Sequence, residues 1–268
     1  MAEVEMQKLA AYVEYDGHDF VGWQSQDGLR SVQAEVERAL GKVAAHPVQV
    51  RCAGRTDAGV HALGQVVHFE SRAQRRSRGW ILGSNTHLPP DINIYWVGPV
   101  AGDFDARFRA LSRSYRFLIL NAQARSAIWA KRCLYEPRPL DVHAMQLGAQ
   151  ALIGTHDFST FRGRDCQAKS PVKTVHGLRL RRHADWVILD IEAGGFLHNM
   201  VRNIVGTLME VGRGAKSPDW VGSALASRER RQCGPTVAPC GLYFLGAKYE
   251  EHFGLPPFRS QILPFPLD

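Results

Sequence analysis

Residues 48–70 read VQVRCAGRTDAGVHALGQVVHFE, and this stretch contains two strand-like segments separated by a turn. We expect strands at 48–53 and 64–70, where β-branched residues gather. Asp57 lies between them, two residues before a glycine. Asp and Gly at this spacing are typical of a turn, because Asp bonds nearby backbone N–H groups and Gly accepts a positive φ. The stretch therefore predicts strand, turn, strand, with a carboxylate at the turn.

The neighbouring segments extend this stretch to a β-α-β-β-α-β series. We expect strands at 8–15 and 92–97 and helices at 31–43 and 78–87, the first of which has Ser31 as its N-cap. The second half repeats the order. Its expected elements are strands at 114–120, 172–182, 185–192 and 241–249 and helices at 140–154, capped by Asp141, and 196–212.

This order predicts an α+β protein made of two ferredoxin-like (RRM-like) halves packed side by side. We place the halves at 1–104, which carries the Asp57 loop, and 105–268, which ends in a proline-rich tail. An active-site cleft is expected between the halves, since ligands often bind where two such bodies meet. The tail at 256–266 is expected to be an extended arm, because its prolines exclude regular helix.

Composition is that of an ordinary cytoplasmic protein. Hydrophobic residues make up 45% and charged residues 22% of the chain. No apolar run approaches the roughly 18–20 residues of a membrane span, and the N-terminus does not resemble a signal peptide. The five cysteines are scattered, without the spacing of a disulfide framework or a zinc site. We therefore expect neither a metal nor a membrane partner.

The charge balance favours a polyanionic partner. The formal net charge is +7, and Arg outnumbers Lys by 26 to 7. Guanidinium groups bind phosphate in a bidentate manner, although a codon bias towards Arg explains the same ratio. The run Arg72, Arg75, Arg76 and Arg78 is either a solvated basic segment or an additional phosphate contact.

Asp57 is the first candidate for chemistry. A glycosidase needs two carboxylates at a set separation, and the only other carboxylate in this stretch is the distant Glu70. A lone carboxylate can still attack a sugar carbon or stabilise a cationic sugar. It must stay ionised, which a nearby guanidinium ensures by lowering its pKa. Arg55 and Arg202 are candidates for that guanidinium.

Each of the other candidates has a structural alternative. Arg202 lies among apolar residues of a predicted helix, so it either pairs with an acid or extends to the surface. Tyr115, on a predicted strand, is either a core tyrosine or a ring that stacks on a base. His156, Arg162 and Arg164 belong to a loop that contacts phosphate or is merely solvated.

Seven motifs together resemble one family, the tRNA pseudouridine synthases of the TruA type. In chain order they are EYDGHDFVGWQ (14–24), GRTDAGVHALGQVVHF (54–69), LPPDINI (88–94), DARFRALSRSYRFLI (105–119), GTHDFSTFR (154–162), GGFLHNMVRNIVG (194–206) and APCGLYFLGAKY (238–249). They run in family order across nearly the whole length of the chain, from residue 14 to residue 249. His18-Asp19 and His198-Asn199 differ from the residues usual in the family, which affects only the surroundings of the site.

The resemblance implies a cofactor-free isomerase that converts uridine to pseudouridine at positions 38–40 of the tRNA anticodon stem-loop. It also implies a homodimer with tRNA lying across both subunits. Asp57 then matches the catalytic aspartate, Tyr115 the active-site tyrosine and Arg202 the arginine that pairs with the aspartate. Arg55 matches an arginine implicated in holding open the site of the flipped-out base.

Two other functions fit parts of the sequence. A non-catalytic RNA-binding protein or RNA chaperone with two sheet platforms would have an aromatic-rich Lys/Arg-Gly-Phe/Tyr strand, and the sequence has none. A sugar-cleaving hydrolase lacks its second carboxylate. In the isomerase, the target base must be flipped out of its stack, and Val60, Phe196 and Leu197 are expected to exclude water from it.

Overall fold

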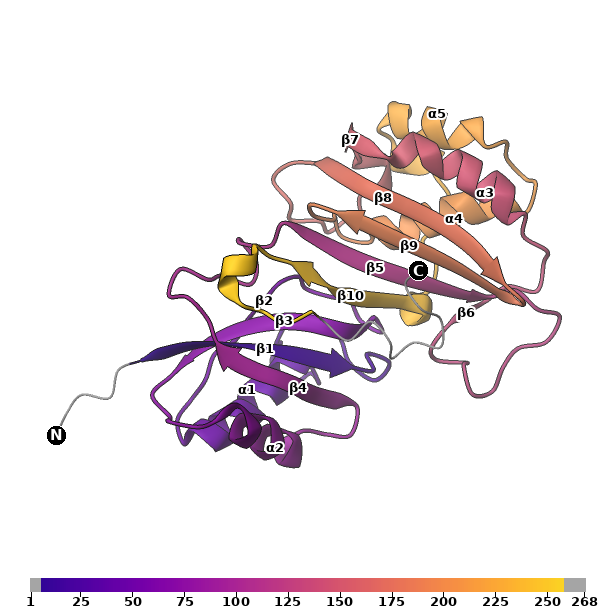
Figure 1. Ribbon diagram of the computed structural model, residues 1–268. Helices are drawn as coiled ribbons and strands as arrows, with labels where there is room; N and C mark the ends of the chain where they lie inside the picture. Colours follow the sequence, from indigo (N-terminus) through magenta and orange to yellow (C-terminus); the bar gives the residue numbers. More distant parts are fainter. Residues whose placement is uncertain (1–5, 258–268) are drawn as a thin grey trace. The chain divides into compact units, whose positions relative to one another are not determined.

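Strand β1 (Gln7–Tyr15) lies at the centre of the first sheet, with β3 (His61–Ser71) and β4 (Ile92–Pro99) antiparallel on either side of it. The structure is a computed structural model that describes residues 6–257 (Figure 1). The short strand β2 (Arg51–Cys52) and strand β10 (Leu242–Lys248) each pair with β3. Helices α1 (Val32–Ala44) and α2 (Ser77–His87) lie together on one side of this sheet.

The core of this unit is formed by the inner face of the sheet and the apolar stripe of α1. Val32, Val36 and Leu40 recur at helical spacing along α1 and are fully buried. Trp80 anchors α2, and its ring meets that of Phe69 on β3 edge to face at 5.3 Å. The buried apolar residues of β1 and β3 therefore hold both helices against one face.

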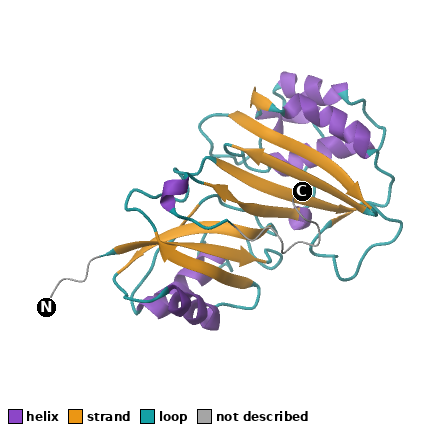
Figure 2. Cartoon of the chain, in the orientation of Figure 1, coloured by secondary structure: helices purple, strands orange, loops and turns teal. Residues whose placement is uncertain are grey.

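The second unit is a sheet in the order β5-β9-β8-β7 with helices α3, α4 and α5 (Figure 2). Its strands are β5 (Ser112–Leu120), β6 (Leu134–Tyr135), β7 (Gly154–Asp157), β8 (Val172–His183) and β9 (Trp186–Ala193). Its helices are α3 (Val142–Ala149), α4 (Met200–Gly212) and α5 (Asp219–Ser227). Short 3-10 turns occur at Gln150–Leu152, Ser159–Phe161, Arg230–Gln232, Pro239–Gly241 and Glu251–Phe253.

The described chain divides into two compact units. One contains the residues up to Leu111 and those from Phe244 on, and the other is Ser112–Tyr243. The α+β class predicted from the sequence is confirmed. The division at 104/105 and the cleft between the halves stay predictions, and the arm expected at 256–266 lies outside the described residues apart from its first two.

Several predicted elements differ in extent, for identifiable reasons. The strand expected at 48–53 is reduced to Arg51–Cys52, because the N–H of Val50 donates to the side chain of Glu37 (2.9 Å) rather than to a strand. Ser31 occupies the N-cap position of α1 but makes no side-chain capping bond. Asp141 does cap α3, and accepts from the N–H of Ala144 at 2.9 Å.

The second unit shows two further differences. The helix expected from 196 begins only at Met200, because Asn199 adopts a left-handed conformation (φ 60°). His156 lies on β7, which pairs with β8, and not in a helix-terminal loop.

Candidate active site

Asp57 lies on the connection between β2 and β3, in the tight turn that the sequence predicts. The N–H of Val60 donates to the carbonyl oxygen of Asp57 at 3.2 Å, and Gly59 has the positive φ (75°) that the turn requires. Asp57 is half-buried, whereas Arg55 is exposed. The turn therefore places a carboxylate at the surface of the unit. The backbone of the turn is held by its own hydrogen bond, from Val60 to Asp57.

A second loop, residues 16–23 between β1 and α1, holds this turn from outside. The N–H of Trp23 donates to the carbonyl oxygen of Thr56 at 3.0 Å, and the N–H of Gly59 donates to that of Phe20 at 3.3 Å. Gly22 forms an isolated antiparallel bridge with Asp57 itself. Bonds on both sides of the aspartate thus restrict its backbone.

The two loops approach so closely that glycine is required at two positions of the second one. A Cβ on Gly22 would lie 2.7 Å from the carbonyl oxygen of Thr56, and the φ of Gly22 is +111°. A Cβ on Gly17 would overlap the carbonyl oxygen of Val60. The YDG and GWQ segments of the sequence are therefore the backbone support of the Asp57 turn.

Buried polar groups beneath the turn add to this support. The hydroxyl groups of Tyr15 and Thr56 are hydrogen-bonded at 2.8 Å, and the Gln65 amide donates to the carbonyl oxygen of Gly54 at 2.6 Å. Burial raises the pKa of Tyr15 well above its ordinary value, so that it stays a neutral hydroxyl. The N–H of Gly17 donates to Nδ1 of His61 at 3.1 Å.

Sequence reasoning did not identify these supporting residues as functional. Tyr15, Thr56, His61 and Gln65 are all buried. A signal for His61 and Gln65 was nevertheless present, since each is a polar residue in a mostly apolar stretch next to the turn, and buried polar groups need partners.

Tyr115 belongs to the second unit, on β5. Its side chain is only 8% exposed, and its ring meets that of Phe196 edge to face at 5.0 Å. Its cross-strand neighbour on β9 is Ile191. Phe196 immediately precedes Leu197, so Tyr115 lies beside the residues expected to exclude water.

Arg202, on the first turn of α4, is held by its own unit. Its Nε donates to the carbonyl oxygen of Val237 at 2.8 Å, and its Nη1 donates to Oδ1 of Asn199 at 2.7 Å. The side chain is half-buried, so it does not extend freely into solvent. Asp57 belongs to the other unit, and its pairing with Arg202 stays a prediction.

The three candidates for phosphate contact differ in their surroundings. Nη2 of Arg162 donates to the carbonyl oxygens of Cys166 (2.6 Å) and Ala168 (3.0 Å), and so closes the loop that follows β7. Arg164 is exposed on that loop. His156 bonds the carbonyl oxygen of Ile153 through Nε2 at 2.8 Å. Arg162 therefore positions the loop, while Arg164 is accessible to a ligand.

A buried ion pair joins the neighbouring strands β5 and β9 of the second unit, and this pair was not predicted from the sequence. Arg116 on β5 is fully buried, and it donates to both carboxylate oxygens of Asp190 on β9 at 2.7 and 2.9 Å. Arg181 on β8 approaches the same carboxylate at 3.3 Å. Arg116 and Asp190 are directly opposite in the β5–β9 register. A charge buried in this way needs such a partner.

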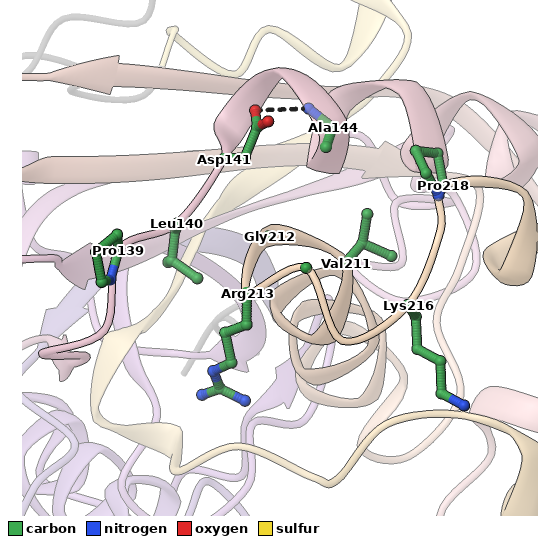
Figure 3. Close-up of a pocket in the computed structure, with 10 residues that line it drawn as sticks. Pro139, Leu140, Asp141, Ala144, Val211, Gly212, Arg213, Lys216 and Pro218 are labelled. Atoms are coloured by element: carbon green, nitrogen blue, oxygen red, sulfur yellow. Dashed lines mark hydrogen bonds between the residues drawn. The ribbon is translucent and has the colours of Figure 1, made fainter.

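One cavity of about 600 Å³ lies in the second unit, between the start of α3 and the end of α4 (Figure 3). Asp141, Ala144, Val211, Arg213 and Pro218 are among its lining residues. None of the predicted site residues lines it, and Asp141 is already engaged in capping α3. It is therefore not part of the predicted site.

Residues 6–257 contain no group of three or more His, Cys, Asp or Glu side chains arranged to hold a metal ion. In the same range, every helix is too short or too polar to span a membrane.

Comparison with known proteins gives consistent matches. The family model described as tRNA pseudouridine synthase matches residues 11–109 and 149–250, which include Asp57 and Arg202 but not Tyr115. The chain is 51% identical to "tRNA pseudouridine synthase A" of Methylococcus capsulatus over 248 residues, 92% of each chain. It is 49% identical to the protein of that name from Shewanella amazonensis (93% and 95% of the two chains). The corresponding identity for Coxiella burnetii is 46%, over 97% and 99% of the chains.

Proposed function

Since the chain belongs to the tRNA pseudouridine synthase family, we propose that it isomerises uridine to pseudouridine in tRNA with Asp57 as its catalytic group. The observation that carries the role of Asp57 is the way its turn is held. A half-buried carboxylate on a backbone clamped by residues 16–23 is fixed in position yet accessible to a sugar. Such positional restraint is what catalysis by a single carboxylate needs.

The proposed reaction begins when the target uridine leaves its stack and enters the site. Asp57 promotes cleavage of the bond between N1 and C1′, either by attack on C1′ or by removal of a sugar proton. The uracil then turns in place and forms a bond from its C5 to C1′; in the attack route this breaks the bond between Asp57 and C1′, and in the proton-removal route the sugar regains its proton from Asp57. The proton on C5 leaves to a base, and the N1 position of the turned ring gains a proton, so the product is an isomer of the substrate.

The other candidates have supporting roles in this proposal. Tyr115 stacks on the uracil, Arg202 orients Asp57, and Arg55 holds open the space left by the flipped base. Arg164 and His156 contact tRNA phosphate, and Arg162 shapes the loop that carries Arg164. Phe196, beside Tyr115 at 5.0 Å, helps to exclude water so that the freed uracil is not lost.

We place the modified uridines at positions 38–40 of the anticodon stem-loop, and propose a cytoplasmic homodimer that works without a cofactor. The two halves, 1–104 and 105–268, then contribute Asp57 and Tyr115 respectively to one site.

Incubation of the protein with transcribed tRNA, followed by carbodiimide treatment and primer extension, tests this function. We expect pseudouridine at positions 38–40. Asp57→Asn should abolish it while tRNA affinity stays within a few-fold, and the exposed Asp27→Asn serves as the matched control. Unchanged tRNA that is tightly bound would instead identify an RNA chaperone, and released uracil would identify a hydrolase.

A further inference from the structure

The connection from β3 to α2 carries four arginines in seven residues. Arg72, Arg75, Arg76 and Arg78 are all exposed, and we call them the β3–α2 arginine patch. Within residues 6–257 none of the four makes an ion pair. Their one side-chain hydrogen bond runs from Arg75 to the adjacent carbonyl oxygen of Gln74, at 3.4 Å. The patch is therefore a concentration of positive charge without internal neutralisation.

Some other exposed arginines of the same unit are paired with carboxylates. Arg30 pairs with Asp91 at 2.9 Å and Arg38 with Glu35 at 2.6 Å, both within the same unit as the patch. These pairs are also at the surface, so exposure alone does not explain why the patch lacks acids. The clustering at 72–78 is a local feature and not a consequence of a generally Arg-rich chain.

The position of the patch raises the electrostatic free energy of its positive charges. It lies at the N-terminus of α2, where the helix dipole already has its positive end. Helices α1 and α5 carry Glu35 and Asp219 in their first turns, but α2 has no acid there and no side-chain cap. Cations at this place repel both the dipole and one another, and an anion would offset both effects.

The backbone of the patch is anchored at both ends. Before it, Oγ of Ser71 bonds His46 at 2.9 Å, and the N–H of Ala73 donates to the same Oγ at 3.1 Å. Near its end, between Arg76 and Arg78, Oγ of Ser77 donates to the carbonyl oxygen of Val97 at 2.5 Å, so this hydroxyl is used for tertiary structure and not for capping. The arginines therefore extend from a fixed backbone, which lowers the entropic cost of binding.

We propose that the β3–α2 arginine patch binds the phosphate backbone of tRNA outside the catalytic region, a proposal that rests on tRNA being the substrate. β3 separates the patch from the Asp57 turn. The ten residue steps from His61 to Ser71 span about 33 Å at ~3.3 Å per residue. That is on the order of one turn of a nucleic-acid duplex. The patch then contacts a part of the tRNA about one duplex turn from the target uridine.

The test compares two variants of equal charge. Arg72→Gln/Arg75→Gln/Arg78→Gln removes three charges from the patch. Its control removes three charges from exposed arginines in the other unit, at Arg125, Arg179 and Arg231. Each variant changes the formal net charge from +7 to +4, since 7 − 3 = 4. The affinity of each variant for full-length tRNA is measured directly at several salt concentrations. The same measurement is made with a hairpin of about five base pairs, which is roughly half a duplex turn and therefore too short to reach the patch.

The patch variant should lower the slope of log affinity against log salt by about 2 to 3, because each phosphate contact contributes ~0.7–0.9. The same values imply a loss of affinity on the order of 100-fold at 0.1 M salt. Affinity for the hairpin should change by no more than it does in the control. At saturating tRNA the patch variant should keep the wild-type turnover, and its melting temperature should not fall.

Equal loss of tRNA affinity in the patch and control variants would overturn the proposal, because general charge would then explain binding. Unchanged affinity and slope in the patch variant would overturn it too, as would an equal loss for the hairpin. Wild-type protein that binds tRNA without forming pseudouridine would refute the proposed catalytic function while leaving the binding comparison valid.

Discussion

Gly22→Ala tests whether the loop at 16–23 fixes the turn that carries Asp57. The new Cβ would lie 2.7 Å from the carbonyl oxygen of Thr56, the residue before Asp57. A carbon and a carbonyl oxygen normally approach to no less than about 3.3 Å, so the two loops must separate by about 0.6 Å. A misplacement of ~1 Å can cost about 100-fold in rate, and we therefore expect kcat to fall on the order of tenfold.

Stability should fall as well. Alanine at the φ of +111° observed for Gly22 costs about 1–2 kcal/mol, and the overlap adds about 1–3 kcal/mol. Two other glycines separate these effects. Gly28 has a φ of +74° with open space around it, so Gly28→Ala should show the backbone strain alone. Gly54 has open space and no positive φ, so Gly54→Ala should be neutral or slightly stabilising.

The assay combines thermal unfolding with single-turnover pseudouridine formation at saturating tRNA. Gly22→Ala should lose rate, Gly28→Ala should lose stability but keep its rate, and Gly54→Ala should lose neither. Wild-type turnover by Gly22→Ala would refute the argument, because the turn would then tolerate displacement. Equal rate losses in the Gly22 and Gly28 variants would also refute it, since strain without overlap would suffice.

Two further predictions concern charged groups. Arg202→Met and Asp57→Asn should show a coupling of about 0.5–3 kcal/mol in a double-mutant cycle of unfolding, whereas additive penalties would mean that the two residues do not touch. Burial alone would raise the pKa of Glu136, but hydrogen bonds from Arg138 and Arg213 lower it to about 2. Ionised Glu136 therefore stabilises the folded protein at pH values above its ordinary pKa, and this stabilisation is lost as pH falls towards 2. Glu136→Gln should destabilise the protein at neutral pH, with a penalty that shrinks below about pH 4; a penalty independent of pH in urea titrations would contradict this.

The periodic parts of the fold were predictable because they depend on local pattern. The apolar stripe of α1, the strands β1, β3 and β4 and the cap at Asp141 follow from residue spacing and from the chemistry of single residues. One error arises where a residue of another element competes for a backbone group. Val50 was expected in a strand, but its N–H bonds Glu37 from α1.

The sequence by itself determined the α+β class, the turn around Asp57 and, through its motifs, the family. Only the tertiary structure decided what surrounds these features. Tyr15 lies 41 residues from its hydroxyl partner Thr56, and Arg116 lies 74 residues from Asp190. Neither pairing follows from periodicity, because strand alternation states which face a residue occupies but not which distant residue the sheet register places opposite it. The turn that carries the proposed catalytic aspartate was thus readable from the chain, whereas the rigidity of that turn comes from long-range contacts.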